Sequence, residues 1–443
     1  MSLSAGPRYR TGPLYSDIMG STTRCTRAIT LRRSIVLAVI AAALGYFDLR
    51  HTATIPSTGV NETTAELMAE QQSATDAVPP RVLSLLRESW ADLDPSGPAL
   101  VSSIRQMTPL NEFPHARDTF GGHLLGTFGL LALWGQPNDV CRAGLFHTAY
   151  SGDIFRFFLY DAANAADRAE LRSIIGDAAE QLTWLFGTVD RGSLLGLSHM
   201  MEHDLPPSYS LADYGEELVP VAHRLHGRVS LSTREVAKIM IVTIADYLEQ
   251  LVAVNGWLHH HQVESPSVLW PGDGKPGLGL AWASSLCHAI RSHLEVVPPI
   301  FERCTRTLTR TAEVASRDAY WRAVSLEAEL PQREQAALYT EAIAQNPFIG
   351  EPELMLAQLY FRSGDFGAAL THCGHALRKF VALGTAWDKR RTYAAWVGYA
   401  RLLDVRARRS LRGEPSMPEE TSLPMTSGGM TLISIRKLVG MMP

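Results

Sequence analysis

The stretch FGGHLLGTFGLLALWGQPNDVCRAGLFHTAY, residues 120–150, carries apolar residues at helical spacing and is interrupted by a glycine, a glutamine and a proline. This pattern predicts two helices, at about Phe120–Trp134 and Pro137–Ala149. On the second helix His147 shares a face with Val140, because 3.6 residues make one turn, so its imidazole is expected to point into the protein. The stretch therefore leaves two interpretations of His147: a histidine packed in the core, or a metal ligand.

The rest of the folded region continues the helical pattern, and no convincing stretch of strand alternation is present. We therefore predict an all-α fold. Further helices are expected at about Arg81–Leu93, Ala165–Ile175, Asp177–Thr188, Thr233–Asn255, Gly279–Val296 and Arg306–Leu330.

The composition is that of a globular protein with enough apolar residues for a sizeable core. Of the 443 residues 46% are hydrophobic, and the mean hydropathy is −0.02. The net charge of −4 gives no bulk electrostatic reason to expect a nucleic-acid partner, so none is predicted. The five cysteines are scattered, which argues against a disulfide framework or a cysteine-based zinc site.

Residues 1–47 differ from the rest of the chain. They contain six arginines against one acidic residue, Asp17, and end in SIVLAVIAAALGYF, Ser34–Phe47. An apolar run of 14 residues is shorter than the approximately 20 that a membrane-spanning helix needs. The segment is interpreted as an organelle or secretory targeting sequence, or alternatively as a membrane anchor. Membrane contact is expected only through this segment if it stays uncleaved, and the localisation stays open.

The known glycine-rich nucleotide-binding motifs and the known hydrolase motifs are absent from the sequence. What remains is a set of ionisable residues on apolar helical stripes, namely His123, His147 and Asp246. A buried carboxylate is costly unless it is paired or bound to a metal, so Asp246 requires a partner. Two imidazoles and one carboxylate match a mononuclear two-histidine-one-carboxylate metal site. The competing interpretation is two core histidines and a hydrogen-bonded aspartate.

The same residues carry a family resemblance. Residues 120–150, followed by LRSIIGDAAEQLTWLFGTVDR and by VTIADYLEQ, resemble the HD superfamily of metal-dependent phosphohydrolases, and most of all the alarmone-hydrolase domains of the RelA/SpoT type. They are closer still to an uncharacterised, domain-of-unknown-function family with the same pattern. The resemblance covers roughly Leu110–Trp257. It implies that His123, His147 and Asp246 bind a divalent metal such as manganese, iron or zinc.

One residue departs from the HD pattern. Thr148 stands where the family has the aspartate that completes the metal ligands. Nearby, Asp153 is one position beyond the acidic pair that activates water in alarmone hydrolases, and it is the only candidate for a general base in this segment. The resemblance therefore implies a weaker metal site and a changed mechanism.

Other candidates for chemistry have less support. His115 and Arg117 precede the first predicted site histidine and are candidates for binding a phosphorylated substrate, because guanidinium groups match phosphate oxygens. The alternative for both is a solvated helix end. Three further groups are better explained as solvent-facing residues: His199 with His203, the run His259–His261, and the basic residues Arg378, Lys379, Lys389, Arg390 and Arg391.

The segment from about residue 331 to 412 resembles tetratricopeptide repeats, a helix-turn-helix unit of about 34 residues. Such a short array is expected to pack against the preceding helical domain and to depend on it for stability. The positions that carry the resemblance are Pro347, Ala357, Tyr360, Gly364, Phe366, Ala369 and Ala376. The predicted organisation is a targeting or anchor segment at 1–47, a disordered linker at 48–80, the HD-like domain at 81–330, the repeats at 331–412 and a disordered tail at 413–443.

Two functions are compatible with these residues. The first is a metal-dependent phosphohydrolase-like enzyme that hydrolyses or binds a small phosphorylated metabolite. The second is a catalytically inactive HD-like sensor or scaffold, whose tetratricopeptide-like repeats bind a protein partner. Thr148 favours the second function. Asp246 favours the first, since a site that has lost its activity has little reason to keep a costly buried carboxylate.

Overall fold

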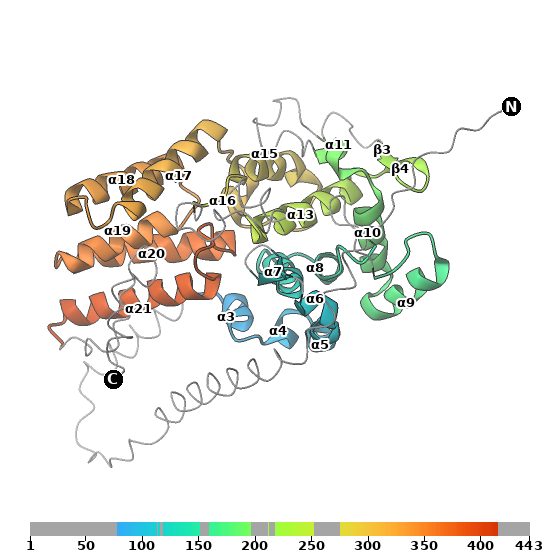
Figure 1. Cartoon of the computed structure of the whole chain (residues 1–443), viewed down its shortest axis with the longest axis horizontal. Coiled ribbons are helices and arrows are strands. Elements are labelled where there is room, and N and C mark those ends of the chain that lie inside the picture. Colours follow the sequence, from blue (N-terminus) through green and yellow to red (C-terminus); the bar gives the residue numbers. More distant parts are fainter. Residues whose placement is uncertain are drawn as a thin grey trace, which may run out of the picture. The chain divides into compact units, whose positions relative to one another are not determined.

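The computed structural model of the chain describes residues 78–112, 114–115, 118–150, 159–195, 211, 218–251 and 275–414. All of them fall in one compact unit, Leu67–Pro443. This unit is predominantly α-helical, which confirms the predicted fold class (Figure 1). The segment 1–47, in which we predicted targeting or anchoring, lies outside the described residues, as does the tail from residue 415 onward.

The first helices of the described region are shorter than predicted. The expected helix Arg81–Leu93 is divided at Glu88, whose φ of 55° is incompatible with a continuous right-handed helix. Two further short helices follow before residue 113, and the sequence did not reveal them. The four helices are α3 (Pro80–Leu86), α4 (Trp90–Leu93), α5 (Gly97–Gln106) and α6 (Thr108–Glu112).

Four helices form the centre of residues 81–330 and pack against one another. They are α7 (Phe120–Leu133), α8 (Asn138–Leu145), α10 (Asp177–Thr188) and α13 (Thr233–Glu249). Helix α13 is buried along most of its length and contacts the other three, so it is the axis of this core. Around this four-helix core lie α9 (Ala165–Ile175), α11 (Arg191–Leu195) and α15 (Leu280–Ile290).

Several predicted helix ends were wrong. Helix α8 ends at Leu145, because Phe146 leaves helical geometry and its N–H bonds back to the carbonyls of Arg142 and Ala143. Helix α17 (Arg310–Ser325) begins later than expected, since the Thr309 hydroxyl caps it by accepting from a backbone N–H.

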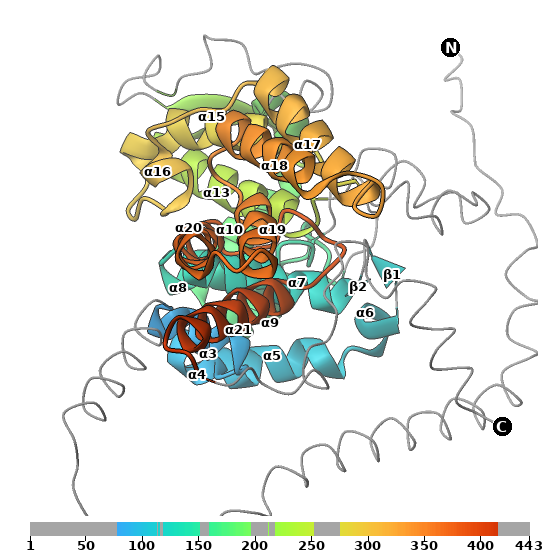
Figure 2. The same cartoon turned by 90° about the vertical axis from the view of Figure 1, so that its left-hand side faces the viewer.

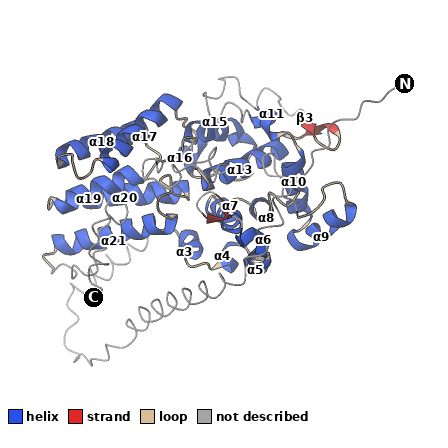
Figure 3. Cartoon of the chain, in the orientation of Figure 1, coloured by secondary structure: helices blue, strands red, loops and turns tan. Residues whose placement is uncertain are grey.

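Two short antiparallel hairpins interrupt the helical pattern, and the expectation of no strands was wrong in this detail (Figure 3). Strands β1 (Pro114–His115) and β2 (Asp118–Thr119) pair just before α7. Strands β3 (Val219–His223) and β4 (Gly227–Leu231) pair just before α13. The alternation in β3 covers only five residues and includes a proline at an exposed position, which explains why the sequence pattern was missed.

The C-terminal part consists of helices in which each one packs against the next in the chain (Figure 1, Figure 2). They are α17, α18 (Gln332–Gln345), α19 (Glu351–Arg362), α20 (Phe366–Leu383) and α21 (Tyr393–Leu411). Side-chain hydrogen bonds also join distant segments here. The indole of Trp134, beside α7, donates to the Leu383 carbonyl at 3.0 Å, and the Tyr320 hydroxyl donates to Asp388 at 2.7 Å.

Among the described residues, every helix is too short or too polar to cross a membrane. The four cysteines described, Cys141, Cys287, Cys304 and Cys373, are buried free thiols, as expected from their scattered positions.

A buried carboxylate fixes the start of α15. Glu313, on α17, has no exposed surface and accepts hydrogen bonds from the backbone N–H groups of Gly279, Leu280 and Ala281 at 2.7–3.2 Å. These N–H groups belong to the first turn of a helix and have no partner within it. The side chain of Glu313 therefore acts as a cap supplied by another helix.

We predict that Glu313→Ala lowers the free energy of unfolding by about 1–3 kcal/mol, because it leaves three buried donors without an acceptor. Asp318→Ala, at an exposed position on the same helix, is the matched control and should change stability by less than about 0.5 kcal/mol. Urea unfolding followed by circular dichroism measures both. Equal effects of the two substitutions would contradict the capping role.

Candidate metal centre

The first predicted ligand, His123, lies on α7, in the turn that follows the helix start. The Thr119 hydroxyl accepts from the Gly122 N–H at 3.0 Å and caps the helix. His123 is 2% exposed and faces α13. The predicted inward orientation of this histidine is what the structure shows.

The second predicted ligand, His147, follows the end of α8 and lies in a turn. His147 is therefore not on the helix face that we predicted for it, although its side chain is indeed buried, with 2% exposed. Its ring packs edge-on against Phe186 of α10, with the ring centroids 5.4 Å apart. The turn after α8, rather than the helix itself, aims this imidazole into the core.

The third predicted ligand, Asp246, lies near the C-terminal end of α13. This helix begins with a capping box in which Ser232 and Glu235 satisfy each other's backbone N–H groups. Asp246 is 7% exposed, and the other buried residues of α13 are almost all apolar.

The three predicted residues come together. The Asp246 Oδ1 atom lies 3.2 Å from Nε2 of His123 and 3.7 Å from Nε2 of His147. One potential ligand atom from each residue lies within 4.8 Å of the other two. Donor atoms at this separation fit a single first-row divalent ion, since nitrogen and carboxylate ligands sit about 2.0–2.2 Å from such ions.

The outer nitrogen of each imidazole is held by a second group. Nδ1 of His123 is 2.5 Å from Oε2 of Glu249, and Nδ1 of His147 is 2.7 Å from the carbonyl oxygen of Gly144. Both partners accept a hydrogen bond from the Nδ1–H group, and Nε2 of each ring is the atom that faces Asp246. Metal-binding histidines usually have this arrangement, in which an acceptor behind the ring fixes the tautomer and its orientation.

Glu249 reaches His123 because residue 126 of α7 is a glycine. A Cβ atom at Gly126 would lie 2.7 Å from the Glu249 side chain, so the carboxylate occupies the space that any larger residue would fill. Glu249 is three residues after Asp246 and therefore lies on the same face of α13.

A buried arginine completes the surroundings of Asp246. Arg191, the first residue of α11, is 6% exposed, and its Nη1 atom lies 3.9 Å from Oδ2 of Asp246. The same atom donates to the Thr243 hydroxyl at 3.4 Å, and the guanidinium carbon lies 3.8 Å from the ring centre of Phe186. A positively charged planar group therefore lies beside the carboxylate, on the side of its second oxygen.

The charges in this cluster shift the pKa values in opposite directions. Burial disfavours the imidazolium of His123, but the hydrogen bonds and charges of Asp246 and Glu249 outweigh burial and raise its pKa to about 9. For His147, burial dominates and lowers the pKa to about 4. Burial also opposes ionisation of Asp246, but the neighbouring imidazoles and Arg191 outweigh it and hold its pKa well below the ordinary value. One histidine is thus protonated at neutral pH and the other is neutral.

The remaining predicted site residues are less well defined. Thr148 lies next to His147 and is half-buried. Asp153 and Arg117 lie outside the described residues, and so do His199, His203 and His259–His261; His115 lies in β1, but its side chain is not among those described. The expected solvated basic face on the C-terminal helices was partly wrong, since Lys379 and Arg390 form ion pairs with Glu353 and Asp388.

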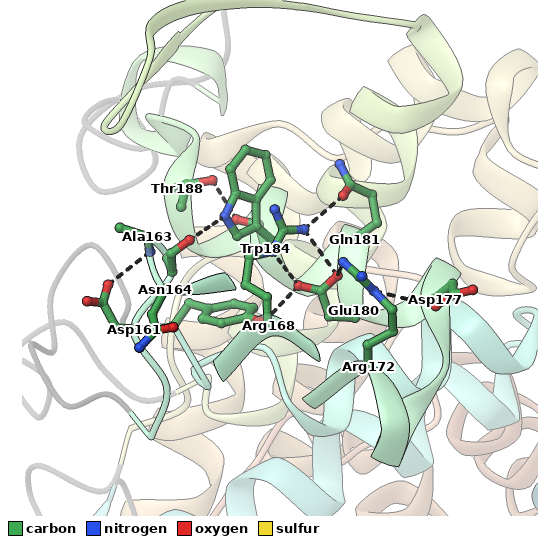
Figure 4. Close-up of polar contacts among 12 residues, drawn as sticks. Asp161, Ala163, Asn164, Arg168, Arg172, Asp177, Glu180, Gln181, Trp184 and Thr188 are labelled. Atoms are coloured by element: carbon green, nitrogen blue, oxygen red, sulfur yellow. Dashed lines mark hydrogen bonds and ion pairs between the residues drawn. The ribbon is translucent and has the colours of Figure 1, made fainter. Parts of the chain in front are cut away.

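The GDAAEQL segment at residues 176–182, which supported the HD resemblance, has a structural role in α10. Figure 4 shows the Glu180 carboxylate between Arg168 and Arg172, whose nitrogens donate to it at 2.7–3.1 Å. Tyr150 donates to the same carboxylate at 2.7 Å, and the Arg168 guanidinium stacks on Trp184. This buried ion cluster joins α9 to α10 and contacts none of the three predicted ligands through a described hydrogen bond.

Two functional groups were missed in the sequence. Glu249 was detectable, because it follows Asp246 by one helical turn on a stripe already identified as inward-facing. Arg191 was not detectable as a site residue, since nothing in its local pattern indicates that α11 brings it to Asp246.

We predict that His123 makes the stability of the metal-stripped protein depend on pH. Its folded pKa of about 9 exceeds the unfolded value of about 6.5, so its contribution is complete below pH 6.5 and is lost as the pH rises through 9. The free energy of unfolding of the wild type should therefore fall relative to that of His123→Asn between pH 6.5 and 9.5, by on the order of 2–3 kcal/mol. Urea unfolding at several pH values measures this difference. A constant difference across the range would show that His123 is not ion-paired.

Comparisons with known proteins identify part of this region. Residues 106–191 match a family model described as Domain of unknown function (DUF6817). Neither a curated protein nor a solved structure matches the chain. The match includes His123, His147 and Arg191 but ends before α13, which carries Asp246. A domain of unknown function is therefore present at residues 106–191, as the resemblance to such a family led us to expect.

Proposed function

We propose that His123, His147 and Asp246 hold a divalent metal ion in an HD-like domain that binds and hydrolyses a small phosphorylated metabolite. The observation that carries the proposal is the orientation of the two imidazoles. Their Nε2 atoms face one carboxylate oxygen from 3.2 and 3.7 Å, and their Nδ1 atoms are held by Glu249 and the Gly144 carbonyl. Packing alone does not require both rings to be oriented in this way.

The donor set suits manganese, iron or zinc, because imidazole and carboxylate ligands bind all three. A bound ion would polarise a phosphoryl oxygen and lower the pKa of a water molecule. The proton on His123 has to leave before its Nε2 atom becomes a ligand, so metal binding is coupled to proton release. Gln250 donates a hydrogen bond to Oδ1 of Asp246 at 2.7 Å. An ion bound to Oδ1 would either share this oxygen with Gln250 or displace that hydrogen bond.

Arg191 supports a phosphorylated ligand better than the residues predicted from the sequence. It is buried next to Asp246, and Phe186 and Thr243 fix the plane of its guanidinium. A guanidinium held in place binds phosphate oxygens in a bidentate manner. In this proposal Arg191 orients the phosphoryl group, and Glu249 positions His123.

The proposed ligand set differs from the HD pattern at Thr148, which offers a neutral hydroxyl in place of a carboxylate. Two imidazoles and one carboxylate carry a single negative charge, so the metal is held less tightly than in a complete HD site. For this reason the second candidate function, an inactive sensor or scaffold, is kept. Its further support is that the protonated His123 and Arg191 neutralise Asp246 and Glu249 even when no metal is bound.

For the scaffold function we propose tetratricopeptide-like repeats in α18–α21 that bind a protein partner. The support is the packing of small residues between α19 and α20, where Ala357, Ala369 and Ala376 are fully buried, and the tight turn at Gly364 with a φ of 83°. Deletion from residue 332 does not test this function, since it also removes the contacts of Trp134 and Tyr320 with the C-terminal part. Substitutions of exposed residues on the full chain are required.

We predict that His147→Ala and Asp246→Ala each bind one fewer equivalent of divalent metal per chain than the wild type. The full chain is stripped with a chelator, dialysed against Mn²⁺, Fe²⁺ or Zn²⁺, and analysed by atomic mass spectrometry. His226→Ala is the matched control, because it removes an exposed histidine from the β3–β4 turn. If both variants retain the metal content of the wild type, the proposed site is wrong.

We predict that Arg191→Lys weakens phosphate binding about tenfold, equivalent to about 1.4 kcal/mol, because lysine keeps the charge but loses the bidentate geometry. Competition by inorganic phosphate against hydrolysis of a nitrophenyl phosphate, with Mn²⁺ present, provides the measurement. Arg228→Lys, at an exposed position of β4, is the control. Unchanged metal content together with weakened phosphate binding supports the assigned role. Equal binding by both variants contradicts it, and bound metal without turnover of any phosphorylated compound supports the sensor function instead.

A further inference from the structure

A second group of potential metal ligands lies in the C-terminal helices, outside the candidate metal centre. It consists of Glu353 on α19 and of His372 and His375 on α20. These two helices pack side by side (Figure 1). His372 and His375 are three residues apart, so both rings lie on the face of α20 that contacts α19. One potential ligand atom from each of the three residues lies within 4.8 Å of the other two.

The two oxygens of Glu353 have different surroundings. Oε1 accepts a hydrogen bond from the ammonium of Lys379 at 2.8 Å. Oε2 lies 2.7 Å from Nδ1 of His372 and 3.7 Å from Nδ1 of His375. The carboxylate is nearly buried, with 3% of the residue exposed.

An ion-pair cluster without metal explains only part of this geometry. The pair of Glu353 with Lys379 neutralises the carboxylate, and His372 donates to its second oxygen. The 3.7 Å separation of His375 is too long for a hydrogen bond, although its Nδ1 atom faces the same oxygen. In the described part of the chain His375 has no hydrogen bond. A cation among the three atoms would use all of them.

The site also has an entrance. Glu353 and His375 line a cavity of about 350 Å³ between α20 and two other segments, one with Phe301 and one with Phe348. Arg378 and Lys379 lie on the same wall, so an anion from solvent is able to approach a bound cation from this side. Three protein ligands beside a cavity leave a coordination position open.

The geometry points to a second divalent-metal site, formed by Glu353 Oε2 and the Nδ1 atoms of His372 and His375. Zinc or another first-row ion of similar preference is the class that two imidazoles and one carboxylate select. Lys379 holds the other oxygen of Glu353 and thereby fixes the orientation of the ligand. Tyr360 stacks on His372, with 5.4 Å between the ring centroids, and fixes that ring in turn. This site is independent of the proposed function of the first centre.

The test is cobalt binding to the chelator-stripped full chain, followed by visible absorption and by metal analysis. His372→Ala and His375→Ala are expected to lose one equivalent of Co²⁺ relative to the wild type and to retain the equivalent that His147→Ala loses. The substituted side chains are 23% and 41% exposed, so both variants should fold, which thermal unfolding checks. His226→Ala again serves as the control with an exposed histidine.

The outcomes separate the two sites. If the wild type binds a single equivalent that is lost in His375→Ala but kept in His147→Ala, the second site exists and the first does not. If His372→Ala and His375→Ala both bind as much Co²⁺ as the wild type, the second site is refuted and the cluster is an ion-pair network. Zn²⁺ competition against bound Co²⁺ should displace the equivalent that depends on His375.

Discussion

The carboxylate of Asp246 is the constraint around which the core is organised. The other buried residues of its helix are almost all apolar, and an isolated ionised carboxylate in such surroundings is very costly. Three segments distant in sequence each bring a nitrogen group to it: α7 with His123, the turn after α8 with His147, and α11 with Arg191. The packing of these elements around α13 has to place all three groups at once. The fold therefore depends on compensating the charge of one side chain, Asp246.

Under the proposed function this cluster has a metal-free form and a metal-bound form. Without a metal, the protonated His123 bridges Asp246 and Glu249, and the charges balance. With a metal bound, His123 would lose the proton on Nε2, and the same Glu249 would hold the ring by its outer nitrogen. Such a site would suit weak metal binding, which is what the HD resemblance implies for Thr148, the residue that stands where the HD pattern has an aspartate. The two proposed functions, hydrolase and sensor, therefore use the same residues and differ in whether a metal occupies the site.

The sequence predicted the parts of this account that depend on local periodicity. The helical spacing in residues 120–150 and in α13 identified His123, His147 and Asp246 as inward-facing, even though His147 lies beyond the helix on which we placed it. The hairpins β3–β4 and β1–β2 were missed, since their alternation is too short to stand out. Arg191 was missed because its approach to Asp246 depends on how α11 packs, a tertiary contact with no local signature. The pair His372 and His375 has a helical spacing visible in the sequence, but its carboxylate partner lies on another helix.

The most direct test of the metal centre is a crystal structure of the full chain grown with Mn²⁺ or Zn²⁺, with anomalous data collected at the absorption edge of the metal. The account predicts an anomalous peak about 2.0–2.2 Å from Nε2 of His123, Nε2 of His147 and a carboxylate oxygen of Asp246. The outer nitrogens should keep their contacts with Glu249 and the Gly144 carbonyl. An absent peak, with His123 still bonded directly to Asp246 at a saturating metal concentration, would contradict the account and would leave the cluster as a buried ion pair that stabilises the core.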